Sequence, residues 1–169
     1  MSRIGFKSLS SGSCGNCYFI GIFNEDNTCR SSILIDAGVS PRRLKKELSK
    51  DNIPLESISG ILVTHDHYDH VRSLGSYCKH LETPVWVTPQ LSPALARVHT
   101  IGEHYPLRRK VLGQGWNEIC GHDILARYFV VPHDATQTVG YAIMIDGYKF
   151  VIMTDVGRMT EEALSLASQ

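Results

Sequence analysis

Short apolar segments separated by polar turns run along most of the chain. Many of these segments are rich in β-branched and aromatic side chains, which is typical of strands. The segments that predict strands are residues 4–9, 17–23, 32–35, 61–63, 85–87, 124–131, 139–145 and 148–153. The first two are separated by a small, glycine-rich turn and the last two by Asp146-Gly147, and both arrangements predict hairpins.

Helical spacing of apolar residues occurs between several of these strands. Ser40-Pro41 is typical of a helix start, and Leu44 and Leu48, four residues apart, give that helix an apolar stripe. Further helices are predicted at residues 71–81, 89–98 and 160–167, whereas residues 99–121 carry no clear pattern. Paired strands with helices between them predict an α+β fold with a mixed sheet and helical cover.

Composition and charge restrict the function classes. The 169 residues fit one domain, spanning 1–169, and 43% apolar with 20% charged residues is typical of a globular protein. Seventeen basic and 17 acidic residues give no net charge, which argues against a generally basic nucleic-acid coat but is compatible with a local basic patch. No apolar run approaches the ~18 residues that span a membrane. Without a signal peptide or a disulfide framework among the five cysteines, we expect a reduced, cytoplasmic protein.

Three of the eight histidines lie within residues 65–70, directly after an apolar strand segment. Imidazole and carboxylate are common ligands of Zn²⁺ and similar ions. His65 and His67 are two residues apart, so an extended backbone directs both side chains to the same side. Asp69 and His70 follow at a helix start, within reach of a point a few ångströms away. This spacing favours two adjacent metal ions over one ion, and a metal site over a solvated loop.

Two further residues occupy similar places in the predicted strand pattern. His133 and Asp155 each follow an apolar, β-rich segment and precede a turn. Because strand ends converge at one edge of a sheet, we expect both to join the metal centre rather than to be a structural histidine and a turn former. Cys14 and Cys17 have metal-ligand spacing, but no second pair accompanies them. We interpret them as small hairpin residues rather than as a ligand or redox pair.

These segments resemble the metallo-β-lactamase superfamily. Three stretches match its recurring motifs in order: Leu34–Gly38, the His-x-His-x-Asp-His signature at His65–His70, and Thr154–Gly157. Residues 9–16 and 131–135 are similar to the YycJ/WalJ-like subgroup, which is associated with DNA exonuclease activity. The resemblance implies an αββα sandwich. Family members continue with a further C-terminal part of the fold and a last histidine ligand, so the resemblance implies that residues 1–169 are either an N-terminal fragment or a shortened form that lacks this ligand.

The resemblance also implies roles for individual residues. Two divalent ions, Zn²⁺ or Mn²⁺, would be bound by six residues: His65, His67 and His133 at the first ion, Asp69 and His70 at the second, and Asp155 between them. The second site would be weak because the last family histidine is missing. Asp36 resembles the family aspartate that braces the metal loop, and such bracing orients ligands.

A pair of metal ions suits phosphodiester hydrolysis, because it activates water, withdraws charge from the phosphate and stabilises the leaving oxygen. We therefore predict a metal-dependent hydrolase, most simply a phosphodiesterase or DNA exonuclease. A metal-bound hydroxide would attack, with Asp69 as the catalytic residue that orients it. The alternatives are hydrolysis of a thioester, lactam or other small ester on the same site, and a non-catalytic metal-binding or interaction domain.

The sequence gives weaker indications about partners. Residues 41–50 carry five basic side chains and one acidic one. A solvated helix face explains this run, and contact with a DNA backbone is the alternative, through four residues: Arg42, Arg43, Lys45 and Lys46. A chain that ends near residue 169 would leave the last strands partly uncovered, which favours a homo-oligomer.

Overall fold

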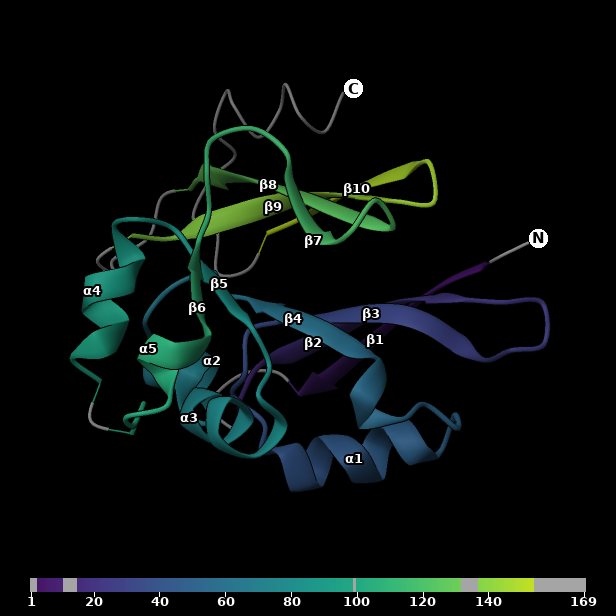
Figure 1. The fold of residues 1–169 in the computed structure, drawn as a ribbon, viewed down its shortest axis with the longest axis horizontal. Helices are drawn as coiled ribbons and strands as arrows, with labels where there is room; N and C mark the ends of the chain where they lie inside the picture. Colours follow the sequence, from purple (N-terminus) through teal and green to yellow (C-terminus); the bar gives the residue numbers. More distant parts are fainter. Residues whose placement is uncertain (1–2, 11–14, 99, 132–136, 154–169) are drawn as a thin grey trace.

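The computed structural model describes residues 3–10, 15–98, 100–131 and 137–153, which build two stacked sheets (Figure 1). The larger sheet has six strands in the order β1-β2-β3-β4-β5-β6, and the smaller has four in the order β10-β9-β8-β7. The strands of the larger sheet are β1 (Arg3–Ser10), β2 (Cys17–Phe23), β3 (Cys29–Ile35), β4 (Ile58–Leu62), β5 (Val85–Val87) and β6 (Arg109–Val111). Those of the smaller sheet are β7 (Asn117–Cys120), β8 (Ile124–Val130), β9 (Val139–Ile145) and β10 (Tyr148–Ile152).

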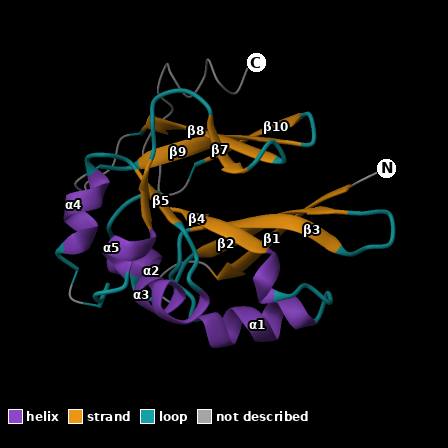
Figure 2. Ribbon diagram, in the orientation of Figure 1, coloured by secondary structure: helices purple, strands orange, loops and turns teal. Residues whose placement is uncertain are grey.

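Helices cover the face of the larger sheet that points away from the smaller one (Figure 2). The α-helices are α1 (Pro41–Ser49), α2 (Tyr68–Val71), α3 (Leu74–Ser76), α4 (Leu91–Ala96) and α5 (Tyr105–Arg108). A 3₁₀ turn, η2 (Leu55–Ser57), and a π-helical turn, η3 (Tyr77–Leu81), complete this layer. Among the described residues, no helix combines the length and the apolar character needed to cross a membrane.

The pairing of the strands brings several strand ends to one edge. Strands β1, β2 and β3 are antiparallel, whereas β3, β4, β5 and β6 are parallel and are joined by crossovers that contain the helices. Because parallel strands all end at the same edge, the residues that follow Ile35, Leu62 and Val87 lie together there. This edge receives the metal loop, which we define as residues 65–70.

Alternating side chains on the larger sheet give the protein two cores. One core joins the sheet to the helices and includes Phe19, Leu34 and Ile61 with Leu44 and Leu48 of α1. The other lies between the sheets and is formed by neighbours of these strand residues on the opposite face, together with β8 and β9: Ile20, Ile33, Leu62, Ile124, Tyr141 and Ile143. Successive strand residues point to opposite faces, so one sheet supports both cores.

Most of the predicted strands are confirmed, and the segment predicted to be helical at residues 71–81 is helical but interrupted. The chain there is broken into α2, α3 and η3. Ser73 leaves helical geometry and donates its backbone N–H to the Ala37 oxygen at 3.0 Å. Gly75 packs against the backbone of Ile101, where a side chain would collide. Tertiary contacts therefore override the local helical pattern. The helix predicted at residues 89–98 is shorter, and the one at residues 160–167 lies outside the described residues.

Candidate metal centre

The metal loop leaves β4 at the edge where both sheets come together. The backbone N–H of Val139, at the start of β9, donates to the Thr64 oxygen at 2.9 Å. The Tyr141 hydroxyl donates to the Val63 oxygen at 2.6 Å. Burial raises the pKa of the Tyr141 hydroxyl well above its usual range, so this group stays a donor. The smaller sheet thus fixes the backbone directly before His65.

A buried carboxylate organises the loop from below. Asp36 is fully buried, and its Oδ1 accepts from the Thr64 backbone N–H at 2.8 Å. Its Oδ2 accepts from the Thr64 hydroxyl at 2.6 Å and lies 2.6 Å from Nδ1 of His70. Because the Thr64 hydroxyl gives its proton to Asp36, its oxygen accepts from Nδ1 of His65, which lies 2.8 Å away. Both rings therefore carry their proton on Nδ1, and Nε2 is the nitrogen with a lone pair for a metal.

The donor set fits a divalent metal ion. Ligand atoms of Asp36, His65 and His70 lie within 4.8 Å of one another, and all three residues are buried. The His65 ring centre is 4.0 Å from that of His70 and 4.7 Å from that of His67. Both oxygens of Asp36 already accept hydrogen bonds, so its place is that of a brace, while the imidazoles suit Zn²⁺ or a similar ion. His67 and Asp69 are half-buried beside them.

The sequence reasoning gave no role to Asn16, which the structure brings into the centre. Its Nδ2 donates to Oδ2 of Asp69 at 2.9 Å and lies 3.0 Å from Nε2 of His70. Asn16 is 5% exposed and comes directly before β2. It ends the stretch 9–16 that resembles a family motif, and that position was the available signal.

Backbone contacts close the centre around Asn16. The Ala37 N–H donates to the His70 oxygen at 2.7 Å, and the Gly38 N–H donates to the Asn16 oxygen at 2.9 Å. A Cβ atom at Gly38 would collide with the Asp69 carbonyl oxygen and the Asn16 nitrogen. Arg72 donates from Nε to the Gly38 oxygen at 2.7 Å. Only glycine therefore allows the three segments to approach so closely.

Not all of the predicted site residues can be placed. His133 and Asp155 lie outside the described residues, as does Cys14. Cys17 is fully buried, and burial raises the pKa of its thiol far above the usual range, which suits a packing residue and not a metal ligand. The four basic residues of α1, which are Arg42, Arg43, Lys45 and Lys46, are exposed on the helical side of the larger sheet (Figure 1).

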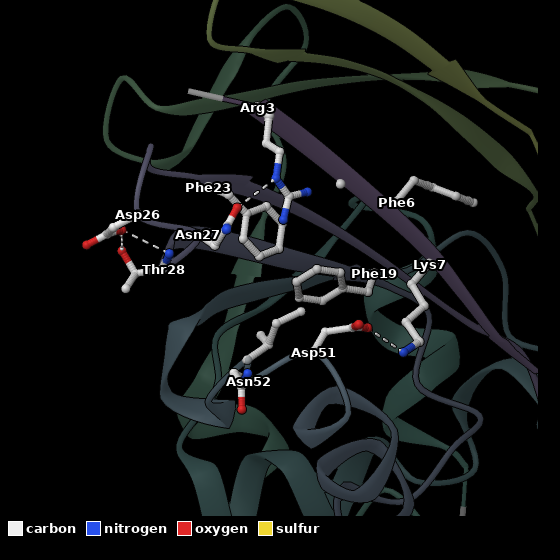
Figure 3. Close-up of a pocket in the computed structure, with 12 residues that line it drawn as sticks. Arg3, Phe6, Lys7, Phe19, Phe23, Asp26, Asn27, Thr28, Asp51 and Asn52 are labelled. Carbon is white, nitrogen blue, oxygen red and sulfur yellow. Dashed lines mark hydrogen bonds and ion pairs between the residues drawn. The ribbon is translucent and has the colours of Figure 1, made fainter. Parts of the chain in front are cut away.

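The cavity in Figure 3, of about 400 Å³, lies away from the metal loop. It is lined near the start of β1, where Arg3 pairs with Phe23 across the sheet, whereas the far end of β1 leads to Asn16. Its charged groups are engaged with neighbours: Lys7 Nζ lies 2.8 Å from Asp51 Oδ2, and the Arg3 guanidinium lies 4.4 Å from the Phe23 ring centre. This cavity has no set of converging ligands like that of the metal loop.

Comparison with known proteins agrees with this geometry. The family model described as beta-lactamase superfamily domain matches residues 31–168. An exodeoxyribonuclease WalJ from Streptococcus pneumoniae is 29% identical over 163 residues, covering 95% of this chain and 58% of that protein. An exodeoxyribonuclease YycJ from Bacillus anthracis is 30% identical over 156 residues, covering 92% of this chain and 56% of that protein. The chain thus spans less than three fifths of either relative.

A solved structure shows the same fold. The crystal structure of Zn²⁺-bound PqqB from Methylobacterium extorquens matches with a TM-score of 0.64 and 18% sequence identity. The match covers 87% of this chain and 55% of that one. The predicted metallo-β-lactamase fold class is therefore confirmed.

Proposed function

From the premise that the chain belongs to the beta-lactamase superfamily domain family, we propose that it is a metal-dependent phosphodiesterase acting on DNA ends. The observation that supports the proposal is the buried network of Asp36 and Thr64, which contacts His65 and His70 at Nδ1 and so places the lone pair of each ring on Nε2. The names of the two exodeoxyribonuclease relatives support DNA as the substrate.

The proposed centre binds two divalent ions, Zn²⁺ or Mn²⁺. Its ligands are His65, His67 and His133 at the first ion and Asp69 and His70 at the second, with Asp155 between the two. Among the described members, the grouping of the rings of His65, His67 and His70 supports this assignment. His133 and Asp155 are proposed on their sequence positions alone.

The residues of the chain have separate tasks in this proposal. Two bound ions would supply an acidic water and positive charge beside the phosphate. Asp36 fixes the orientation of both His65 and His70, directly in one case and through Thr64 in the other. Oδ2 of Asp69 accepts a hydrogen bond from Asn16. The other oxygen, Oδ1, would accept a hydrogen bond from the attacking water and so orient it.

A metal and activity assay tests the proposal. The chain, supplied with Zn²⁺ or Mn²⁺, is expected to bind one to two ions, and a longer form that includes the rest of the family fold is expected to shorten end-labelled duplex DNA. The double variant His65→Ala, His67→Ala should lose metal and at least about a hundredfold in rate, because the first ion loses two ligands. His122→Ala is the matched control, since that exposed histidine contacts Glu118 and should leave both readouts unchanged.

Two results would contradict the proposal. Less than a tenth of an equivalent of bound metal after loading would show that the chain has no metal centre. Rapid turnover of a thioester or a β-lactam, with no cleavage of DNA or of bis(p-nitrophenyl) phosphate, would show that the protein is a different hydrolase and not a phosphodiesterase.

We also propose that DNA contacts the exposed basic residues of α1. Each neutralised phosphate adds about one to the slope of log affinity against log salt concentration. Changing Arg42, Arg43, Lys45 and Lys46 to serine should therefore flatten this slope by up to about four while cleavage of bis(p-nitrophenyl) phosphate is unchanged. An unchanged slope, measured by DNA-binding anisotropy, would show that α1 is only a solvated face.

A further inference from the structure

The side chain of Asn16 links two residues of the metal loop across a separation of more than 50 positions in the sequence. Its amide nitrogen lies 2.9 Å from Oδ2 of Asp69 and 3.0 Å from Nε2 of His70, and those two atoms are 3.7 Å apart. An amide group has two N–H donors, so it can donate to both atoms at once. The carboxylate and the ring are therefore held side by side.

The proton arrangement of His70 is consistent with this double donation. Nδ1 of His70 faces a carboxylate, Asp36, and so carries the proton. Nε2 of the neutral ring is then an acceptor, and an amide N–H can donate to it. A metal ion needs the same Nε2 lone pair. When an ion occupies it, the donation from Asn16 to Asp69 can persist, since it uses the other N–H of the amide.

Asp69 depends on such a contact more than His70 does. Its side chain is 35% exposed, whereas that of His70 is 1% exposed and is already fixed by Asp36. An exposed carboxylate samples several rotamers unless a partner restrains it. Asn16 is a suitable partner because it is itself buried, and because its backbone N–H donates to the backbone carbonyl oxygen of Asp69 at 2.8 Å.

We propose that Asn16 is a positioning residue whose side-chain amide holds the Asp69 carboxylate beside His70 in the arrangement needed for the second metal ion. This inference rests on the proposed function, which assigns Asp69 and His70 to that ion. Asn16 binds neither metal nor substrate in this role. It acts by holding Oδ2 of Asp69 and by preparing the pair before an ion arrives.

The test compares Asn16→Ala with a structural asparagine. Asn117 is the matched control, because its two amide N–H groups are shared among three backbone oxygens within 3.3 Å of Nδ2, those of Gly113, Gly115 and Ala126, away from the metal loop. Zn²⁺ affinity is measured by competition with a chromophoric chelator, and stability by urea unfolding of the metal-free chains. Asn16→Ala should weaken the second Zn²⁺ by about tenfold or more, because loss of a partner behind a ligand has effects of this size. The first Zn²⁺ should change much less.

Asn117→Ala should lower the free energy of unfolding and leave both Zn²⁺ affinities unchanged. A merely structural role for Asn16 would produce the same result there, so a second-site affinity equal to that of the unchanged chain overturns the proposal. If Asn16→Ala does not fold, Asn16→Ser takes its place with the same expectation. Serine is suited to turns, but its short hydroxyl cannot reach both acceptors.

A second measurement needs no metal. In the metal-free protein, side-chain couplings measured by NMR should show a single χ1 rotamer for Asp69, and averaged rotamers in Asn16→Ala. A single Asp69 rotamer in both proteins overturns the proposal even if metal affinity changes. A chain that binds one Zn²⁺ and no second ion even at saturating Zn²⁺ would contradict the proposed two-metal function, while the rotamer comparison would still decide whether Asn16 holds Asp69.

Discussion

Two aspartate–threonine pairs make similar hydrogen bonds in very different surroundings. Asp36 accepts from the backbone N–H and the hydroxyl of Thr64, at 2.8 and 2.6 Å. Asp26 accepts from the same two groups of Thr28, at 3.0 and 2.5 Å. The first pair is fully buried beneath the metal loop, and the second is exposed at the turn between β2 and β3.

The comparison shows that burial decides what such contacts contribute. At the exposed turn, water replaces each hydrogen bond that is lost, so the net contribution is small. Beneath the metal loop, a lost partner leaves Thr64 and His70 with donors that water cannot reach, and the full cost of desolvation remains. The buried pair also directs two imidazoles, so its loss should affect both stability and metal binding.

The largest expected effect comes from Asp36→Asn. In the variant, an amide NH₂ group replaces one carboxylate oxygen, so two hydrogen-bond donors oppose each other in a buried place. This should lower the free energy of unfolding by about 3 kcal/mol or more. Urea unfolding of the metal-free chain measures this, and loss of bound Zn²⁺ should accompany it. Asp26→Asn is the matched control and should be close to the unchanged chain. Equal losses of unfolding free energy in the two variants would show that burial does not make the Asp36–Thr64 pair more important than the Asp26–Thr28 pair.

A second substitution changes the spacing of the loop without touching its polar groups. Gly38→Ala places a Cβ atom against the Asp69 carbonyl oxygen and the Asn16 nitrogen, both of which are backbone atoms that cannot turn aside. We expect a loss of about 2 kcal/mol in unfolding free energy, typical of overpacking. Gly113→Ala is the control, because its Cβ atom would contact only Asn117 at an ordinary 3.6 Å. Similar stabilities of the two variants would contradict the close approach at Gly38.

Much of the fold could be predicted because local patterns determine it. Asp146-Gly147 forms the expected hairpin, with φ angles of 51° and 81° that match a turn with two left-handed residues. Strand β6 escaped prediction because Arg109–Val111 is exposed throughout and shows no alternation. It is a strand only because β5 lies beside it in parallel.

The candidate site divides in the same way. The metal loop is a local signal, since three histidines follow one strand. The contacts from Asn16 to Asp69 and from Asp36 to Thr64 join segments 53 and 28 residues apart. Neither contact produces a regular spacing of residues in the sequence from which it could be predicted. Asp36 was found through a family resemblance, and Asn16 was not found until the fold placed it.

A buried but singly bonded group should give an intermediate effect. Tyr141→Phe removes the hydroxyl that donates to the Val63 oxygen and leaves the ring in place. The unsatisfied carbonyl should cost about 1 kcal/mol in unfolding free energy. Tyr128→Phe is a suitable control on the neighbouring strand, opposite Tyr141 in the pairing, where the side chain is only half-buried. A larger loss for Tyr128→Phe would argue against the importance of the Val63 contact.

The smallest effect is expected at the exposed pair of Lys7 and Asp51, whose side chains are 27% and 58% exposed. The hydrogen bond and charge of Lys7 lower the pKa of Asp51 below its usual range. A lowered pKa in the folded protein means that the unfolded chain takes up the proton first as the pH falls. The contribution of the pair is therefore complete above the unfolded pKa of about 3.9 and is lost as the pH falls through the lower folded value.

Asp51→Asn should cost about 0.5 kcal/mol at pH 7, typical of exposed ion pairs, and the difference should disappear in strong acid. Salt should reduce it as well, because exposed charges are screened. Urea unfolding from pH 7 to pH 2, in low and high salt, measures both trends. A cost comparable to that of Asp36→Asn, or one that survives acid, would mean that exposure does not separate the contribution of this pair from that of the buried Asp36.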